Sequence, residues 1–275
     1  ITTRLVGSEM CIRDSKYTIE DLVSIVKVLR APGGCPWDRA QTHDSIKKNF
    51  IEETYEVVEA INKQDTGGLK EELGDILLQV ALHSEMESEK GNFDFNDVAN
   101  DIVKKLVFRH PHVFGSVQAD DVDSALNSWD SAKQVEKSIK SQTDSMLRVP
   151  RELPALMRAQ KVQHKAAKVG FDWDDVSGAV DKLYEEINEL KTAVSDNVKS
   201  EIEDEFGDVL FSCVNIARFL DVDSEEALTG ATDKFVSRFS TVEQLARERG
   251  IDMNSAGIDE LDKLWDEAKK IKKAE

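Results

Sequence analysis

Residues 72–77 read Glu-Leu-Gly-Asp-Ile-Leu, and residues 205–210 read Glu-Phe-Gly-Asp-Val-Leu. A second pair of matching segments precedes them, because residues 52–56 read Glu-Glu-Thr-Tyr-Glu and residues 185–189 read Glu-Glu-Ile-Asn-Glu. Both pairs are 133 positions apart, since residue 53 corresponds to residue 186 and residue 75 to residue 208. Blocks that recur in the same order at the same offset indicate a tandem duplication.

Three further matches keep this order with a small drift in offset. They are Trp37-Asp38 with Trp173-Asp174, Trp129-Asp130 with Trp265-Asp266, and the pair Lys105 and Arg109 with Lys234 and Arg238. The drift is what short insertions between two copies of one ancestral unit produce. The duplication therefore extends well beyond the acidic blocks.

The apolar residues of both halves follow the period of a helix. Leu73, Ile76, Leu77 and Val80 recur at spacings of three and four, as on one face of an amphipathic helix. Turn-forming residues interrupt this pattern at five places: 31–34, 65–68, 110–112, 148–150 and 195–197. We therefore expect an all-α fold of two tandem helical bundles, each with about four or five helices.

The domain limits are expected at residues 16–145 and 150–275. A polar stretch followed by two prolines lies between Ser141 and Pro154, and such composition is typical of a linker. Residues 1–15 show no helical or strand period, and charged residues interrupt each short apolar patch. We interpret this segment as extraneous or disordered and exclude it from the fold.

Composition narrows the classes of function. Among 275 residues, 36 are Lys or Arg and 54 are Asp or Glu, which leaves a net charge of −18. Such a field repels polyanions, so binding to DNA or RNA polymers is disfavoured. No apolar run is long enough to cross a membrane. Three separated cysteines with no Cys-x-x-Cys pair favour a reducing cytoplasm.

The acidic residues of each half are spaced to share helix faces. Glu53 and Glu56 are three residues apart, as are Glu72 and Asp75, so each pair projects from one face of its helix. A turn at Gly67-Gly68 is expected to fold the two helices into a hairpin and bring the pairs together. In the second half the same spacing applies to Glu186, Glu189, Glu205 and Asp208.

A solvated acidic surface is the simplest interpretation of these residues, but apolar neighbours such as Leu73 and Ile76 place the acids beside the buried face. Carboxylates about 5 Å apart repel by roughly 3 kcal/mol per pair at an effective dielectric of about 20. Six pairs sum to roughly 20 kcal/mol, which exceeds the roughly 5–15 kcal/mol that stabilises a domain. A cation or shared protons are therefore needed. Oxygen ligands favour Mg²⁺, with Mn²⁺ next.

Two other metal chemistries fit the sequence poorly. A di-iron bundle requires Glu-x-x-His, and none of the five histidines has Glu three residues before it. His43-Asp44 is compatible with a histidine-aspartate phosphohydrolase, but the other histidines show no supporting pattern. A bound Mg²⁺ keeps positions open for phosphate oxygens, so a phosphate-bearing substrate is favoured. Four residues are candidates to bind it: Lys182, Lys234, Arg238 and Trp265.

These features together resemble the MazG family of nucleoside triphosphate pyrophosphohydrolases. Besides the paired acidic blocks, the resemblance rests on Gly-Cys-Pro-Trp-Asp at 34–38, Arg-His-Pro-His-Val-Phe at 109–114, Leu-Pro-Ala-Leu at 153–156 and Gly-Phe-Asp-Trp at 170–173. It covers the chain from about residue 16 to the end. The acidic pattern alone marks the wider all-α nucleotide pyrophosphatase group, whereas the ordered set is specific to tandem-domain MazG.

The resemblance implies Mg²⁺-dependent hydrolysis of standard and aberrant nucleoside triphosphates to monophosphate and pyrophosphate, by a homodimer of helical subunits. It also implies metal ligation by both acidic sets, with Glu186, Glu189, Glu205 and Asp208 catalytic, and nucleotide contacts from Lys182, Lys234, Arg238 and Trp265. The second half is the better candidate for activity, because Asn49 stands where the second half has Lys182.

Two alternatives remain from the sequence. The duplicated bundles could form a metal-dependent nucleotide sensor or a dimeric interaction module that binds without cleaving, although both acidic sets are intact. The chain could also be a purely structural helical protein with solvated acids. Titration with Mg²⁺ and a non-hydrolysable nucleotide distinguishes the last of these, since it predicts no heat of binding.

Overall fold

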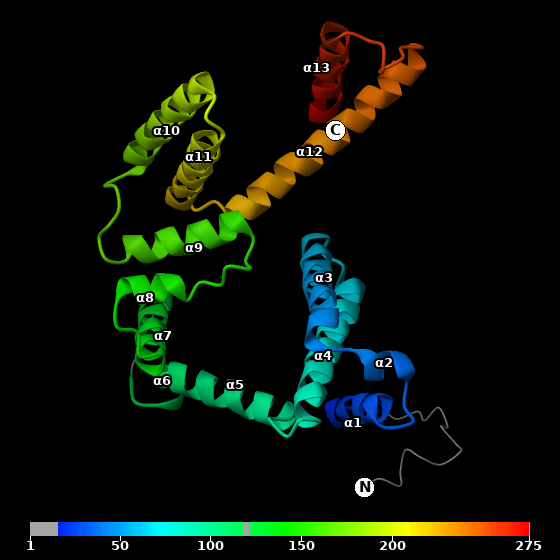
Figure 1. Ribbon diagram of the computed structural model, residues 1–275, viewed down its shortest axis with the longest axis vertical. Helices are drawn as coiled ribbons and strands as arrows, with labels where there is room; N and C mark the ends of the chain where they lie inside the picture. The colour runs from blue at the N-terminus through cyan, green and yellow to red at the C-terminus, as the bar shows by residue number, and fades with distance from the viewer. Residues whose placement is uncertain (1–15, 118–120, 275) are drawn as a thin grey trace. The chain divides into compact units, whose positions relative to one another are not determined.

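The structure is a computed structural model that describes residues 16–117 and 121–274. The expectation for residues 1–15 lies outside these residues. Every regular element in the described part of the chain is a helix, which confirms the all-α fold (Figure 1). The helices are α1 (Ile19–Arg30), α2 (Pro36–Ala40), α3 (His43–Asn62), α4 (Thr66–Ser88), α5 (Phe95–Arg109), α6 (Pro111–Phe114), α7 (Val122–Glu136), α8 (Gln142–Leu147), α9 (Ala155–Ala167), α10 (Val176–Asp196), α11 (Lys199–Phe219), α12 (Ser224–Glu248) and α13 (Ile258–Ala274).

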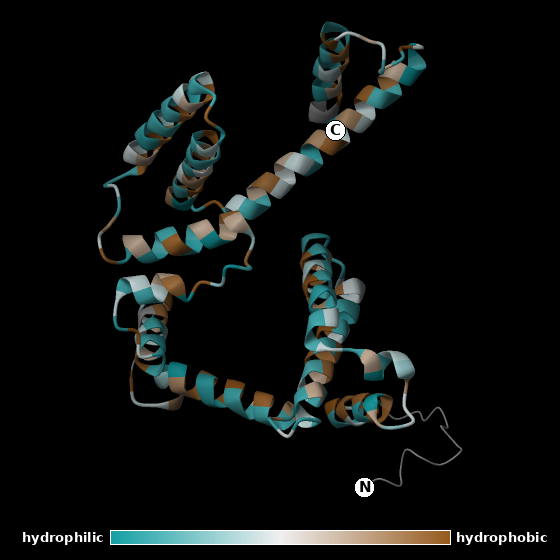
Figure 2. Cartoon of the chain, in the orientation of Figure 1, coloured by the Kyte–Doolittle hydropathy of each residue, from teal (hydrophilic) through white to brown (hydrophobic). Residues whose placement is uncertain are grey.

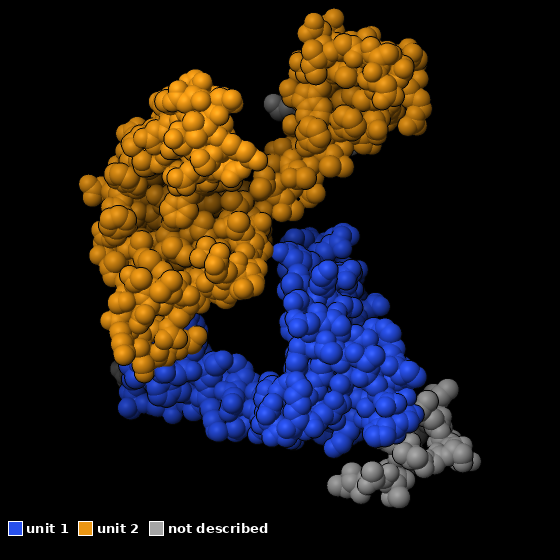
Figure 3. Space-filling model, viewed as in Figure 1, with its two compact units in different colours: residues 1–136 blue, residues 137–275 orange. Residues whose placement is uncertain are grey.

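The chain forms two compact units, residues 1–136 and 137–275, which Figure 3 shows in different colours. Among the described residues each unit has five helices of at least 12 residues, together with two shorter helices in the first unit and one in the second. The domain limits expected near residues 145 and 150 stay a prediction. None of the described helices is both long enough and apolar enough to cross a bilayer.

A helical hairpin is the central feature of each unit: α3 with α4, and α10 with α11. The first hairpin turns at residues 63–65, where Gln64 adopts a φ of 56°. The Asp65 carboxylate then accepts hydrogen bonds from the backbone N–H groups of Gly67 and Gly68, both at 3.0 Å, and caps α4. The expected turn at Gly67-Gly68 was therefore wrong, because this cap draws both glycines into the first turn of α4.

Each unit has its own small apolar core, which holds helices of that unit together. In the first unit, residues of α1, α3 and α4 pack around Val26, Ile46, Leu82 and Met86. In the second, α12 and α13 pack around Val242, Leu245, Ala246, Leu264 and Ala268. Many other large apolar side chains remain exposed, and apolar residues recur along α12 in Figure 2. Burial of such surface stabilises folded and associated states, so these faces are candidates for a partner.

Candidate active site

The hairpin of the first unit brings acidic oxygens together. Glu53 and Glu56 on α3 and Glu72 on α4 each offer an oxygen, and these atoms all lie within 4.8 Å of one another. Asp75, one turn after Glu72, is close enough for its charge to raise the pKa of both Glu53 and Glu72. All four acids predicted from the spacing in this half therefore gather at one place.

The second unit repeats the arrangement. Glu186 on α10 and Glu205 and Asp208 on α11 present oxygens that all lie within 4.8 Å of one another. Glu189 joins them, because contact with the Glu186 carboxyl is the largest cause of its raised pKa. The Glu186 side chain is buried, with 5% exposure for the residue. The spacing of i and i+3 on two paired helices produces the same constellation twice.

Desolvation and mutual repulsion both disfavour the charged form of these acids. Desolvation is the largest cause of the raised pKa of Glu53, Glu72 and Glu205, and neighbouring carboxylates add to it. A nearby divalent cation reverses both effects, since it favours the charged form. The two sites therefore have the electrostatics of cation-binding sites.

The second site contains a buried polar atom that a hard cation would satisfy. The Oε2 atom of Glu205 is buried and has no hydrogen-bond partner. A buried carboxylate oxygen without a partner is costly unless a proton or a cation satisfies it. The remaining donors are carboxylate oxygens, which are the ligand type that Mg²⁺ and Mn²⁺ favour. The residues present therefore fit a hard divalent ion.

Lys182 links the second site to a positive charge. Its Nζ atom lies 2.6 Å from Oε1 of Glu186 and 2.8 Å from Oε1 of Glu185. These two carboxylates, Glu185 first, raise the pKa of Lys182 well above its usual range. The lysine is therefore a permanent cation beside the acidic cluster. Glu185 was missed as a partner, although its spacing of three from Lys182 signals an ion pair on one helix face.

Lys234, Arg238 and Trp265 lie on α12 and α13, outside the hairpin that carries the acids. Lys234 and Arg238 lie on α12, and Trp265 of α13 packs on Phe235 with ring centroids 5.1 Å apart. The Nε atom of Arg238 is buried and lacks a hydrogen-bond partner. Among the described residues no hydrogen bond or ion pair joins these cations to the acids of α10 and α11. The structure thus brings together the acids and Lys182, and leaves this second group apart.

The matching residues of the first unit have different surroundings. Arg109 is buried, and its Nε atom lies 2.6 Å from Oε2 of Glu136. Its guanidinium also lies 5.0 Å from the ring centroid of Trp129, and Lys133 approaches the same ring at 4.6 Å. These cation–π contacts and the ion pair engage Arg109 within its own unit. Asn49 takes the place that Lys182 has in the second unit.

Two all-α units that each hold a carboxylate cluster on a helical hairpin define a class of helical proteins whose acidic clusters could hold a metal ion. Comparison with known families is more specific. Residues 41–114 and 176–243 match the MazG nucleotide pyrophosphohydrolase domain, and these two segments contain both hairpins and both acidic clusters. The chain belongs to this family, and the two matched segments agree with a tandem repeat.

Individual relatives cover almost the whole chain. A Thermotoga maritima protein named nucleoside triphosphate pyrophosphohydrolase/pyrophosphatase MazG is 44% identical over 257 residues, which are 94% of this chain and 98% of that protein. The nucleoside triphosphate pyrophosphohydrolase of Escherichia coli K12 is 43% identical over 92% of this chain and 97% of its own length. Bacillus subtilis YabN, described as uncharacterized, is 47% identical over 91% of this chain and 51% of its own length.

Proposed function

We propose that this protein is a Mg²⁺-dependent hydrolase that cleaves nucleoside triphosphates to monophosphate and pyrophosphate. One observation carries the proposal: the acids of the second hairpin converge with Lys182 beside them, and Glu205 leaves a buried oxygen free. Relatives named as nucleoside triphosphate pyrophosphohydrolases, aligned over almost the whole chain, support the same activity.

Glu186, Glu189, Glu205 and Asp208 are the proposed ligands in the second unit, and Glu53, Glu56, Glu72 and Asp75 in the first. Mn²⁺ is the expected substitute for Mg²⁺, because it favours the same oxygen ligands. When bound, such an ion supplies Lewis-acid stabilisation of phosphate oxygens and acidifies water.

The proposed role of the chain's own residues is to orient the substrate and to move charge. A carboxylate of the second cluster accepts a proton from the attacking water, whose oxygen bonds to the α-phosphorus. The bond from that phosphorus to the bridging oxygen breaks, and pyrophosphate departs with this oxygen. Lys182, Lys234 and Arg238 neutralise the charge that develops on the departing group. Trp265 offers a flat face for the base.

The first test is product identity. Each common ribo- and deoxyribonucleoside triphosphate is incubated with the full chain and Mg²⁺, and the products are separated by chromatography. Monophosphate with pyrophosphate is expected, whereas diphosphate with orthophosphate would contradict the proposed bond cleavage. Glu189→Ala and Asp208→Ala are each expected to abolish turnover without loss of helical content. Full turnover in both variants would overturn the assignment of the second cluster.

Glu56→Ala and Asp75→Ala are the matched variants of the first unit. We propose that the first unit binds a metal ion with little or no cleavage, because Asn49 replaces the lysine and Arg109 is engaged by Glu136 and Trp129. These two variants are therefore expected to retain most of the turnover. A loss as large as that of Asp208→Ala would show that the first unit also catalyses.

We also propose that the active form is a homodimer. The apolar side chains of α11, such as Phe206, Leu210 and Phe211, are exposed to solvent in a single chain, and a second copy could bury them. Among the described residues, no hydrogen bond or ion pair joins Lys234 or Arg238 to the acids of their own chain, so a second copy is the proposed source of these cations. Mixing inactive Asp208→Ala chains with impaired Arg238→Ala chains is then expected to raise the activity above that of either variant alone. Monomeric mass by light scattering, or no recovery on mixing, would refute this arrangement.

A further inference from the structure

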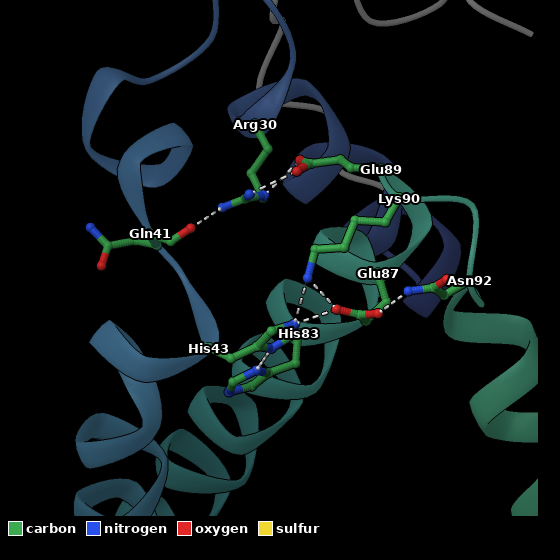
Figure 4. Close-up of polar contacts among 8 residues, drawn as sticks. All are labelled: Arg30, Gln41, His43, His83, Glu87, Glu89, Lys90 and Asn92. Carbon is green, nitrogen blue, oxygen red and sulfur yellow. Dashed lines mark hydrogen bonds and ion pairs between the residues drawn. The ribbon is translucent and has the colours of Figure 1, made fainter.

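A polar cluster joins the two ends of the first hairpin that lie farthest from its turn (Figure 4). His43 is the first residue of α3, and His83 and Glu87 lie in the last turns of α4. The Nδ1 atoms of His43 and His83 are 2.7 Å apart, and Nε2 of His43 lies 2.6 Å from Oε1 of Glu87. We refer to these three residues as the histidine latch. It is separate from the acidic cluster of the same hairpin.

The two imidazole rings meet edge to edge. Their planes differ by 5° and their centroids are 5.0 Å apart, while the two Nδ1 atoms are separated by 2.7 Å. The centroid separation exceeds the nitrogen separation by about two ring radii, so both nitrogens lie on the line between the centroids. This is the geometry of a direct N–H···N hydrogen bond. Such a bond requires one Nδ1 atom with a proton and one without.

Glu87 determines which nitrogen of His43 carries a proton. Hydrogen bonds from Lys90 at 2.5 Å, from Asn92 at 2.6 Å and from His43 lower the pKa of Glu87 to about 2. The carboxylate is therefore charged throughout the physiological pH range and acts as an acceptor. His43 Nε2 must consequently donate to Glu87, which leaves Nδ1 of His43 to share a proton with His83.

Proton counting shows when the latch holds. With both rings neutral, His83 donates from Nδ1 to His43. With one extra proton on the pair, one of the two Nδ1 atoms still lacks a proton, so the N–H···N hydrogen bond is kept. A second extra proton places N–H groups on both sides of the 2.7 Å contact, so the hydrogen bond is lost and two like charges face each other. Desolvation first and the charge of His43 second lower the pKa of His83, which is the direction that this geometry requires.

The second unit shows that the fold does not need these groups. At the offset of 133 that relates the acidic blocks, His43 corresponds to Val176, which is likewise the first residue of its helix, α10. His83 corresponds to Ile216 and Glu87 to Leu220. The same positions of the second hairpin thus carry apolar side chains, and Leu220 is 58% exposed. The titratable groups are a property of the first unit alone.

We propose that His43, His83 and Glu87 form an acid-sensitive latch that holds the open end of the α3–α4 hairpin and has no counterpart in the second unit. The latch is closed at neutral pH, when both rings are neutral or when the pair carries one proton more than that. It opens when the pair takes up a second extra proton. The inference concerns the hairpin itself and does not depend on the proposed hydrolase activity.

The other charged groups around the latch are paired among themselves. Arg30 of α1 binds both oxygens of Glu89 and the backbone oxygens of Asp38 and Gln41, and so fixes the segment that leads into His43. The remaining contacts are Lys47 with Asp44 on α3, Lys90 with Glu87 and, at 3.5 Å, with Nε2 of His43, and the reciprocal cap of Asp94 and Asp97 at α5. Desolvation raises the pKa of the half-buried Glu85, and the charges of Lys27 and Arg30 act in the opposite direction. Between pH 6.5 and 5 the groups to separate are therefore His83 and Glu85, and the histidine variants described below retain Glu85 as an internal control.

The sign of the pH dependence follows from the direction of the His83 shift. In the folded state the pKa of His83 lies below its ordinary value of 6.5. Above that value both folded and unfolded chains hold it neutral, and the latch contributes fully to stability. As the pH falls from 6.5 through the lowered pKa, the unfolded or open form binds a proton that the closed latch refuses, and this contribution is lost.

The test uses the full chain labelled with ¹⁵N-histidine and followed by NMR between pH 7.5 and 5. His83 is expected to titrate below its ordinary range, together with a change in the Nδ1 signal of His43. Hydrogen exchange, corrected for its intrinsic pH dependence, is expected to lose up to about tenfold protection per pH unit at the start of α3 and the end of α4. The corresponding ends of α10 and α11 should show no such loss.

Two variants keep the test decisive. The double variant His43→Val with His83→Ile installs the residues of the second unit and is expected to remove the acid-induced loss of protection. If that variant does not fold, His83→Gln serves instead, since its amide can donate and accept but does not titrate. The proposal is overturned if His83 titrates at or above its ordinary pKa, or if the variants lose protection in acid as the wild type does.

Discussion

Arg109 and Arg238 occupy matching positions in the two halves but have different partners. Arg109 is buried against Glu136 and Trp129, whereas the Nε atom of Arg238 is buried without any hydrogen-bond partner. A buried guanidinium N–H that lacks a partner is available to an incoming anion, such as a phosphate. Two copies of one residue have thus acquired a structural role in the first unit and a proposed binding role in the second.

Arg238→Ala is expected to lower kcat/KM for nucleoside triphosphates by roughly ten- to a hundredfold, as a charged hydrogen bond of about 1.5–3 kcal/mol would predict. The melting temperature should hardly change. Steady-state kinetics and calorimetry measure the two effects.

The matched control is Arg109→Ala, which is expected to show the reverse pattern. Loss of its ion pair and ring contact should destabilise the first unit by roughly 1–3 kcal/mol, with kcat/KM nearly unchanged. Equal kinetic losses in both variants would mean that the two arginines have the same role.

At the scale of the elements, the two hairpins are closed by different caps. Asp65 caps α4 through two backbone N–H groups, whereas the matching residue of α11, Val198, makes no side-chain cap. The turns themselves match, because Gln64 and Asn197 occupy equivalent positions with φ values of 56° and 54°. A cap satisfies N–H groups that a helix otherwise leaves open at its start.

Exchange of the two cap residues is expected to shift the stability of each unit in opposite directions. Asp65→Val should lower the free energy of unfolding of the first unit by roughly 1 kcal/mol, because two N–H groups lose their acceptor. Val198→Asp should raise that of the second unit by roughly 0.5–1 kcal/mol through a new cap and a favourable helix dipole interaction. Urea denaturation measures both. Destabilisation by both substitutions would contradict the cap explanation.

At the scale of the whole molecule, the net charge of −18 is concentrated in part at two acidic clusters whose carboxyl pKa values are raised. A group with a raised folded pKa contributes stability that is fully present below its unfolded pKa and is lost as the pH rises through the folded value. For Glu53, Glu72, Glu189 and Glu205 this loss begins above pH 4.5. The metal-free protein therefore carries an electrostatic penalty at neutral pH.

Mg²⁺ is expected to raise the melting temperature at pH 7.5 and to have little effect at pH 4.5, where protons already neutralise the clusters. At 100 times its dissociation constant, each site contributes roughly 2.7 kcal/mol of stabilisation. Differential scanning calorimetry with EDTA or Mg²⁺ at both pH values measures this difference. Lys182 makes Glu186 less dependent on a metal, so the first unit should respond at least as strongly as the second.

A pH-independent effect of Mg²⁺ would show that the ion binds outside these carboxyl groups. The double variant Glu56→Ala with Glu189→Ala is the control, since it removes one ligand from each cluster. It is expected to lose most of the stabilisation by Mg²⁺ at neutral pH.

Much of the fold, and the acidic clusters of the candidate site, could be predicted from the sequence. The helical period, the duplication and the i and i+3 spacing of the acids are local or repeated features, so linear distance along the chain is enough to detect them. The acidic clusters form where that spacing predicts, because two paired helices must bring their acid-bearing faces together. The turn at Gly67-Gly68 was misplaced, since the cap by Asp65 depends on a side-chain hydrogen bond that composition does not reveal.

The tertiary structure alone decided which residues meet across long distances in the sequence. His43 contacts His83 forty positions away, and Arg109 contacts Glu136, although neither spacing has a periodic signature. It also decided that Lys234 and Arg238 are separate from the acids of their own chain. Helix propensity and period act over a few residues, whereas such contacts depend on how whole helices pack, and only folding sets that packing.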